Sequence, residues 1–309
     1  MKIAMVFPGQ GSQKQGMMQG FADTAIVRET FADASAVLHE DLWELVETGT
    51  PDALNATVNT QPVMLVSAYA MYRAWQVAGG PAAALMAGHS LGEYTALVAA
   101  GALRFADAVP LVRFRAQAMQ DAVPIGTGAM AVIMGLDADE VHAACAEAAQ
   151  GEVVEAVNFN DQNQIVIAGL KSAVERACVA AKARGAKRAL PLPVSAPFHS
   201  SLLKPAAERL RQRLQGISIV APTVPVIHNV DVARHAEPAA IREALALQAA
   251  SPVRWVETIQ AMQAAGITHV VEIGPGKVLQ GLVKRIAPDL VALPVNDAAS
   301  LTASLEALA

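Results

Sequence analysis

The pentapeptide GHSLG at residues 88–92 places a serine, Ser90, between two glycines, each two residues away. An apolar run, Ala83–Ala87, precedes it, and an apolar stretch of helical length, Leu91–Ala100, follows. Between a strand and a helix, this pattern is typical of a nucleophile elbow, in which the glycines permit a tight turn that exposes the serine hydroxyl. The sequence therefore predicts Ser90 as a nucleophile beside a helix N-terminus, whose free N–H groups stabilise an oxyanion.

A serine hydroxyl is a weak nucleophile and needs a general base, and the chain contains seven histidines. His199 lies in the proline-stiffened loop Ser195–Ser200, and catalytic groups concentrate in such loops. His89 is adjacent to the nucleophile, where its side chain is expected to point away. Spacing alone favours His199 as the base but leaves His228 as the alternative.

No acidic residue stands out as the third member of a triad. In α/β-hydrolases the acid lies between the serine and the histidine in the sequence. Five aspartates lie there, but none follows a clear strand of the large domain: Asp107, Asp121, Asp137, Asp139 and Asp161. The sequence thus predicts a Ser–His dyad, or a triad completed by a non-acidic group.

The glycine-rich segment Pro8–Gln13 follows the first apolar run of the chain. It is not a phosphate-binding P-loop, because no Gly-Lys-Ser/Thr follows, and Lys14 occupies the third glycine position of a dinucleotide fingerprint. Two interpretations remain: a simple turn, or a backbone N–H at Gln10 that donates to an oxyanion.

Short apolar runs alternate with longer amphipathic ones along the chain, which predicts an α/β fold. The expected strands of the larger part are Ile3–Phe7, Ala83–Ala87 and His269–Ile273, and its expected helices include Val63–Gln76 and Phe105–Gln120.

The middle of the chain has a different order of elements. Strands are expected at Ala129–Met134, Val153–Asn158, Gln164–Ala168 and Lys187–Val194. Two helices with capping boxes lie between them, one beginning at Asp137 and one at Ser172. This β-α-β-β-α-β order is ferredoxin-like. We therefore expect a large domain of residues 1–126 and 196–309 with an inserted domain at 127–195.

Composition excludes several classes of protein. Of 309 residues, 53% are hydrophobic and 17% charged, which excludes intrinsic disorder, and the net charge of −5 gives no nucleic-acid footprint. Two cysteines without metal-ligand spacing fit a reduced cytoplasmic compartment. No apolar stretch reaches the roughly 20 uninterrupted residues that a membrane span needs. Nothing in the sequence indicates an oligomer, so a monomer is expected.

Five motifs together resemble the malonyl-CoA:acyl carrier protein transacylases of fatty acid synthesis. The resemblance covers essentially the whole chain, in order, and rests on Pro8–Gln13, Gly88–Glu93, Gly126–Met130, Phe198-His199 and Glu272–Gly276. It implies an α/β-hydrolase-like domain with a ferredoxin-like insert, and a cytoplasmic acyltransferase that uses no metal or other cofactor. Its partners would be malonyl-CoA and acyl carrier protein, and its reaction a ping-pong transfer through an acyl-serine.

The resemblance also assigns roles to individual residues of this sequence. Ser90 corresponds to the nucleophile, His199 to the base, and Gln248 to the residue whose main-chain carbonyl orients the histidine. The backbone N–H groups of Gln10 and Leu91 correspond to the oxyanion hole, and Arg115 to the arginine that binds the malonyl carboxylate. Gln61 and Phe198 correspond to further residues in contact with substrate.

An arginine suits malonyl chemically, because a guanidinium fork binds a free carboxylate through two parallel charge-assisted bonds. Arg113, two residues away on the same helix, must face elsewhere. Other readings stay open at this point: a serine hydrolase with the same elbow, a scaffold protein without chemistry, a malonate-decarboxylase subunit, or an acyltransferase of a polyketide pathway.

Overall fold

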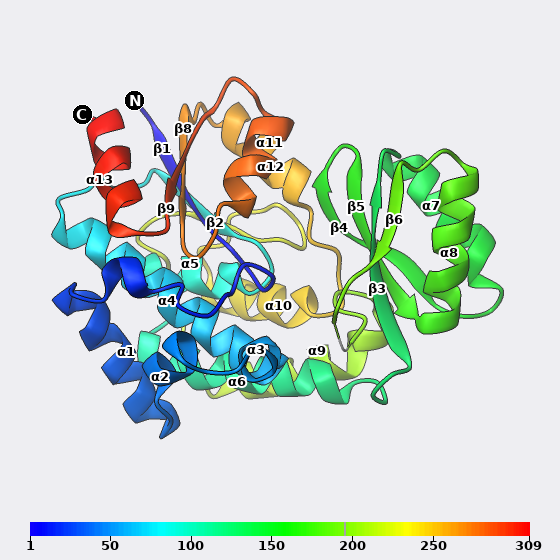
Figure 1. Ribbon diagram of the computed structural model, residues 1–309, viewed down its shortest axis with the longest axis horizontal. Coiled ribbons are helices and arrows are strands. Elements are labelled where there is room, and N and C mark those ends of the chain that lie inside the picture. Colours follow the sequence, from blue (N-terminus) through cyan, green and yellow to red (C-terminus); the bar gives the residue numbers. More distant parts are fainter. Residues whose placement is uncertain (195) are drawn as a thin grey trace.

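The computed structural model describes residues 1–194 and 196–309, and it contains two separate sheets (Figure 1). The larger sheet is entirely parallel, with the strand order β7-β2-β1-β8-β9. Its strands are β1 (Ile3–Phe7), β2 (Leu85–Gly88), β7 (Val226–Ile227), β8 (His269–Ile273) and β9 (Val291–Val295).

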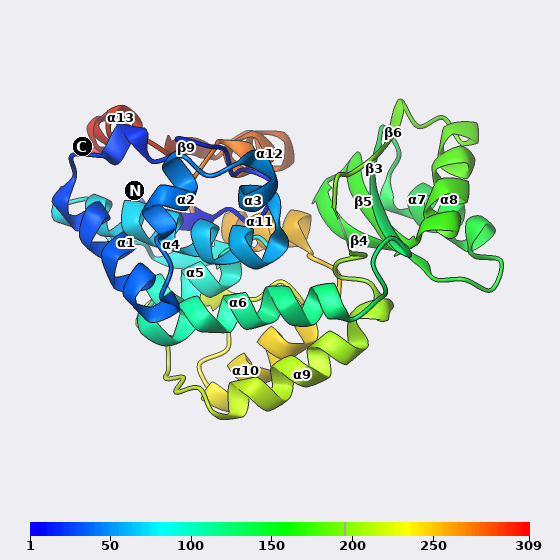
Figure 2. The ribbon, with the colours of Figure 1, turned by 60° about the horizontal axis from the view of Figure 1, so that its bottom comes forward.

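Helices cover both faces of this sheet, as the side-chain alternation of β1 requires. Ala4 and Val6 pack with α11 and α12 on one face, while Met5 and Phe7 join the larger core under α4 and α5 on the other. Below that core, α6, α9 and α10 lie together (Figure 2). The helices of this part are α1 (Ala25–Leu38), α2 (Leu42–Glu47), α3 (Pro51–Asn55), α4 (Thr57–Val77), α5 (Gly92–Ala99), α6 (Phe105–Asp121), α9 (Lys204–Gln215), α10 (Pro238–Gln248), α11 (Trp255–Ala264), α12 (Val278–Ile286) and α13 (Ala298–Ala307), with short 3₁₀ turns η1 (Gln19–Phe21) and η2 (Ser201–Leu203).

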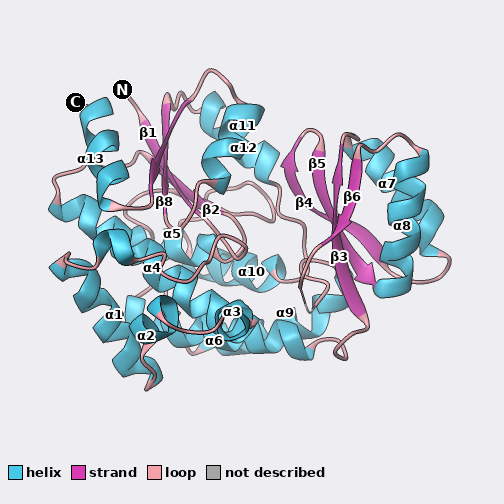
Figure 3. Cartoon of the chain, in the orientation of Figure 1, coloured by secondary structure: helices cyan, strands magenta, loops and turns pink. Residues whose placement is uncertain are grey.

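The smaller sheet is entirely antiparallel and carries two helices on one face (Figure 3). Its order, β4-β5-β3-β6, is that of a ferredoxin-like unit. The elements are β3 (Gly128–Met134), α7 (Ala138–Ala149), β4 (Val154–Asp161), β5 (Gln164–Leu170), α8 (Lys171–Ala183) and β6 (Arg188–Pro191). The predicted fold class, a parallel α/β domain with a ferredoxin-like unit, is confirmed.

We propose residues 127–195 as the inserted domain, because this unit has a hydrophobic core of its own. Ser195, at its predicted end, lies outside the described residues. The unit is joined to the larger part by backbone hydrogen bonds between β4 and Val253, at 3.0 and 2.8 Å. The Glu155 carboxylate adds bonds of 2.7 Å to the N–H and the hydroxyl of Ser201.

Two local predictions for this unit were wrong. Ser172 does not cap α8, because the helix begins at Lys171 and the Ser172 hydroxyl donates to Glu152 instead. The last strand is shorter than predicted: it ends at Pro191, and Pro193, which has no N–H to donate to a ladder, follows two residues later. By contrast, Asp137 does cap α7, accepting from the N–H of Glu140.

No helix in the described part of the chain is both long enough and apolar enough to cross a membrane.

The turn between β2 and α5 depends on direct contact between backbones. A Cβ at Gly92 would lie 2.0 Å from the carbonyl oxygen of Phe7, so the first turn of α5 rests on the end of β1. A Cβ at Gly9 would lie 2.5 Å from the carbonyl oxygen of His89, which brings the segment after β1 equally close to the elbow.

We expect Gly92→Ala to lower the free energy of unfolding by about 3 kcal/mol, because the helix must move away from β1. The matched control is Gly281→Ala in α12, where a Cβ would come no closer than 3.7 Å to a flexible arginine tip. There, a gain of about 0.5–1 kcal/mol is expected from helix propensity. Urea unfolding of both variants checks this, and equal stability of the two would contradict the close packing at the elbow.

Candidate active site

Ser90 occupies the turn between β2 and α5 in a left-handed conformation, with φ of 52°. Its hydroxyl lies 2.7 Å from Nε2 of His199, a residue 109 positions further along the chain. The geometry is that of a hydroxyl donating to a neutral imidazole, which can remove its proton.

His199 lies in the loop that returns from the inserted unit, and its ring is fixed from behind. Its Nδ1 donates to the main-chain oxygen of Gln248, at the end of α10, over 2.9 Å. This bond places the ring proton on Nδ1 and leaves Nε2 free to accept.

None of the aspartates considered above contacts His199 in the described part of the chain. Asp107, Asp121 and Asp161 bind Arg104, Arg209 and Arg285, and Asp137 caps α7.

The His199 ring is buried in a positively charged environment. Burial, and after it the nearby charge of Arg115, lower the pKa of His199 to about 3 despite the hydrogen bond to Gln248, which acts in the opposite direction. The imidazole is therefore neutral, and able to accept a proton, throughout the physiological pH range.

Arg115, on α6, is only 1% exposed and points at the nucleophile. Its Nη2 donates to the Ser90 hydroxyl over 3.1 Å and to Oε1 of Gln248 over 2.8 Å, while Nη1 donates to Oε1 of Gln61 over 2.8 Å. Within the described residues no carboxylate forms an ion pair with Arg115. Arg113 faces the opposite way and pairs with Glu40 at 2.6 Å.

A cavity of about 190 Å³ opens over these groups. The larger part contributes Gln10, Gln61, Ser90, Arg115, Phe198 and His199 to it, together with Met119. The inserted unit contributes mostly apolar wall, from Met130, Asn158, Asn160, Val166, Leu192 and Val194. The cavity therefore lies between the two sheets.

Gln10 and Leu91 both line this cavity, and each has a backbone N–H that donates no hydrogen bond to any described residue. The close contact of Gly9 with the elbow brings the two segments together, and Leu91 immediately precedes α5. The positive end of that helix adds to the field that an oxyanion here would experience.

The two other histidines near the elbow differ from His199 in their contacts. The His89 ring also lines the cavity, where its Nε2 is 2.8 Å from Oδ1 of Asn160. The sequence predicts that the His89 side chain points away from the nucleophile, and the hydrogen-bond partner of its ring is Asn160, not Ser90. His228, the alternative base, is fully buried behind the elbow and contacts Glu93 at 2.7 Å.

Sequence reasoning missed two buried polar residues, Glu93 and Asn229. Asn229 accepts a 2.8 Å hydrogen bond from the Ser90 N–H. Glu93 was detectable as the one charged residue of the otherwise apolar segment Gly92–Ala99, whereas Asn229 gave no comparable signal.

Within the described residues, no three His, Cys, Asp or Glu side chains are grouped as a metal ion would require. A serine hydroxyl bonded to a fixed histidine, with backbone N–H groups available beside it, provides the components of covalent acyl transfer. The fold and this site together define a serine-dependent acyl-transfer enzyme.

Comparison with known proteins agrees with a serine-dependent acyl-transfer enzyme and identifies the family within that class. The acyl transferase domain family matches residues 4–302. The chain is 55% identical to malonyl CoA-acyl carrier protein transacylase of Escherichia coli K12 over 99% of both chains, and 44% identical to that of Bacillus subtilis. The chain belongs to the malonyl CoA-acyl carrier protein transacylase family.

Solved structures show the same fold in full. An acyl-carrier-protein S-malonyltransferase from Burkholderia pseudomallei superposes with a TM-score of 0.98 at 62% identity, covering 99% of this chain and 100% of that one. A malonyl-transacylase solved in complex with a type II PKS acyl-carrier protein has a TM-score of 0.98 at 53% identity, covering 99% of this chain and 100% of that chain.

The low pKa of His199 predicts an unusual pH profile. The second-order rate constant for acylation by malonyl-CoA should stay within about twofold from pH 8 to pH 5, because the free enzyme keeps its base neutral. An ordinary histidine with a pKa near 6.5 would lose about thirtyfold at pH 5. Stopped-flow release of coenzyme A measures this constant, and an acid limb near pH 6.5 would contradict the assignment.

Proposed function

We propose that the chain transfers a malonyl group from malonyl-CoA to the phosphopantetheine thiol of acyl carrier protein, through a malonyl ester on Ser90. One observation carries the substrate assignment: a buried guanidinium, that of Arg115, lies 3.1 Å from the hydroxyl that would be acylated. A buried cation without an acid in contact favours an acyl group that brings its own carboxylate.

In the first half-reaction, the Ser90 hydroxyl attacks the thioester carbonyl of malonyl-CoA while its proton passes to Nε2 of His199. The N–H groups of Gln10 and Leu91 bind the oxyanion of the tetrahedral intermediate. As that intermediate collapses, the carbon–sulfur bond breaks and the imidazolium returns its proton to the coenzyme A thiolate.

In the second half-reaction the same groups act in reverse. The phosphopantetheine thiol gives its proton to His199 and attacks the malonyl ester, and the departing Ser90 oxygen takes that proton back. Because one serine serves both halves, the kinetics are ping-pong. Gln248 keeps the histidine oriented in both halves through its main-chain carbonyl, 2.9 Å from Nδ1.

Arg115 provides discrimination between malonyl and acetyl groups. Gln61 accepts from Nη1 of the guanidinium while Gln248 accepts from Nη2, and Phe198 contributes an apolar side chain to the cavity wall. A malonyl carboxylate that reaches the guanidinium exchanges water for charge-assisted hydrogen bonds. Along with this activity, we propose that the protein acts in fatty acid synthesis, that it is cytoplasmic, and that it is a monomer.

A malonyl adduct on Ser90 is the direct test of the intermediate. Incubation with malonyl-CoA alone should add one malonyl group to the protein by intact-mass spectrometry, and Ser90→Ala should show none. Added holo acyl carrier protein should then take up the group faster than water does. An adduct that persists in Ser90→Ala, or one that only hydrolyses, would refute transfer through this serine.

Loss of Arg115 should affect malonyl selectively. Arg115→Ala is expected to lower malonyl transfer by about 10–200-fold, because the carboxylate loses a charge-assisted partner, while acetyl transfer holds or rises. Arg115→Lys should recover part of the loss, since a point charge lacks the fork. Arg113→Ala, on the opposite face, is the control and should be near neutral. Equal losses with both thioesters would make Arg115 structural.

A further inference from the structure

The backbone at Ser90 adopts a conformation that residues with a side chain rarely take. Its φ of 52° lies in the left-handed region, where the Cβ approaches the following carbonyl. Such conformations persist where the surrounding structure over-determines them. Some group must therefore hold this turn, because it places the hydroxyl on His199 and the neighbouring N–H of Leu91 in the cavity.

Two side chains from distant segments hold the peptide groups on both sides of Ser90. Oδ1 of Asn229 accepts from the Ser90 N–H over 2.8 Å, and Nε2 of Gln248 donates to the Ser90 carbonyl oxygen over 2.9 Å. Asn229 also donates through Nδ2 to the carbonyl oxygen of Gly88, over 2.7 Å. The whole strand-to-helix turn is thus bound by carboxamides at three backbone positions.

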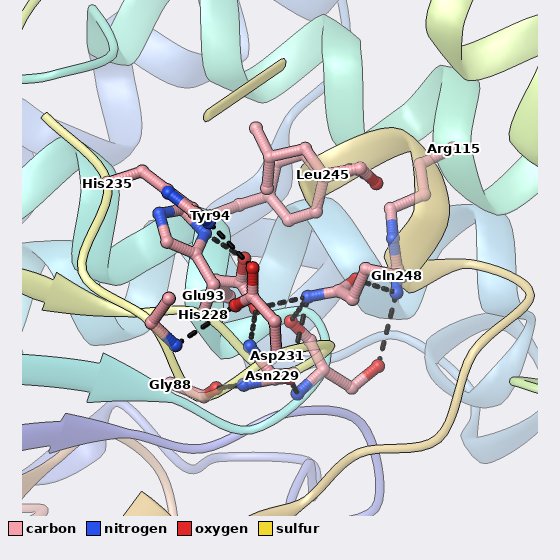
Figure 4. Close-up of polar contacts among 12 residues, drawn as sticks. Gly88, Glu93, Tyr94, Arg115, His228, Asn229, Asp231, His235, Leu245 and Gln248 are labelled. Atoms are coloured by element: carbon pink, nitrogen blue, oxygen red, sulfur yellow. Dashed lines mark hydrogen bonds and ion pairs between the residues drawn. The ribbon is translucent and has the colours of Figure 1, made fainter. Parts of the chain in front are cut away.

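A buried carboxylate binds both of the residues that carry these carboxamides. Glu93 is fully buried in the first turn of α5, and its Oε2 accepts from the backbone N–H of Asn229 over 2.9 Å and from the side-chain Nε2 of Gln248 over 2.8 Å. Its Oε1 lies 2.7 Å from Nδ1 of His228. Figure 4 shows Gln248 between Glu93 and Arg115, with His228 and Asn229 next to the carboxylate.

The carboxylate also decides which way Gln248 faces. Because Nε2 must point toward Glu93, Oε1 points toward Arg115 and accepts its Nη2 over 2.8 Å. One buried acid therefore determines the backbone of the nucleophile and the position of the guanidinium together.

We propose that Glu93 and Asn229 are positioning residues for the acyl transfer. Asn229 clamps the strained turn at Ser90, and Glu93 orients Asn229 and Gln248 so that the clamp and Arg115 stay aligned. This inference rests on the proposed function only in taking Ser90 as the nucleophile. Neither residue lines the cavity, so Asn229 acts through Ser90, and Glu93 acts through Asn229 and Gln248.

The test compares Asn229→Ala, Glu93→Ala and Glu93→Gln, each measured by acylation with malonyl-CoA and acetyl-CoA and by labelling with a fluorophosphonate probe. The probe reports the reactivity of Ser90 without any coenzyme A substrate. We expect both alanine variants to lose about a hundredfold in all three rates, because a small displacement of the hydroxyl is costly. The effect should lie in kcat, with KM within threefold.

Glu93→Gln is the conservative rescue. Its oxygen can take the place of Oε2 and accept from Asn229 and Gln248, and its amide can donate to Nδ1 of His228 in the other tautomer. It should therefore stay within about tenfold of the unaltered protein. Ser304→Ala is the control for a loss of stability alone. It removes a buried hydroxyl in α13 that donates to the carbonyl oxygen of Pro294, and it should leave all three rates unchanged.

Three results would overturn the inference: alanine variants within threefold of the unaltered protein, losses confined to malonyl-CoA, or a Glu93→Gln variant as slow as Glu93→Ala. Failure of the proposed function has a different signature. In that case the unaltered protein takes up no malonyl group, yet the fluorophosphonate labelling rates still report whether Asn229 and Glu93 hold the Ser90 turn.

Discussion

The polar groups of the site are arranged around one buried positive charge. A guanidinium removed from water must be surrounded by acceptors, and Arg115 finds them in carboxamide oxygens from α4 and α10 and in the nucleophile itself. Burial lowers the pKa of His199, and the charge of Arg115 lowers it as well, so the imidazole stays neutral. Neutral acceptors compensate a cation less fully than an anion does, so the same burial that shapes the free protein favours a carboxylated acyl group.

Local sequence patterns predicted the elements that carry this chemistry. The turn at Ser90, the helix of Arg115 and the ferredoxin-like order of the middle segment all follow from apolar periodicity and glycine placement, and the fold class is confirmed. Two sheet strands escaped prediction for physical reasons. β7 is only two residues long, and β9 contains Pro294, which interrupts the residue pattern of a strand although proline is tolerated at the edge of a sheet.

Contacts between distant segments were beyond local patterns. Spacing favoured His199 over His228 only weakly, because the deciding facts are a hydroxyl 109 residues away and a carbonyl at the end of α10. The orienting group is a main-chain oxygen, which every residue possesses and no composition reveals. Family resemblance pointed to Gln248 where spacing could not, but neither pointed to Asn229, whose contact spans 139 residues.

Because the cavity wall is divided between two parts of the molecule, the catalytic groups and much of the apolar lining belong to different structural units. The charged and nucleophilic groups come from the parallel sheet and its helices, whereas much of the apolar lining comes from a unit with its own core. Mutations in that lining can change which acyl chains fit while the charge balance around the serine stays intact. Substitutions in the ferredoxin-like unit can therefore change substrate choice, while the catalytic groups of the larger part stay the same.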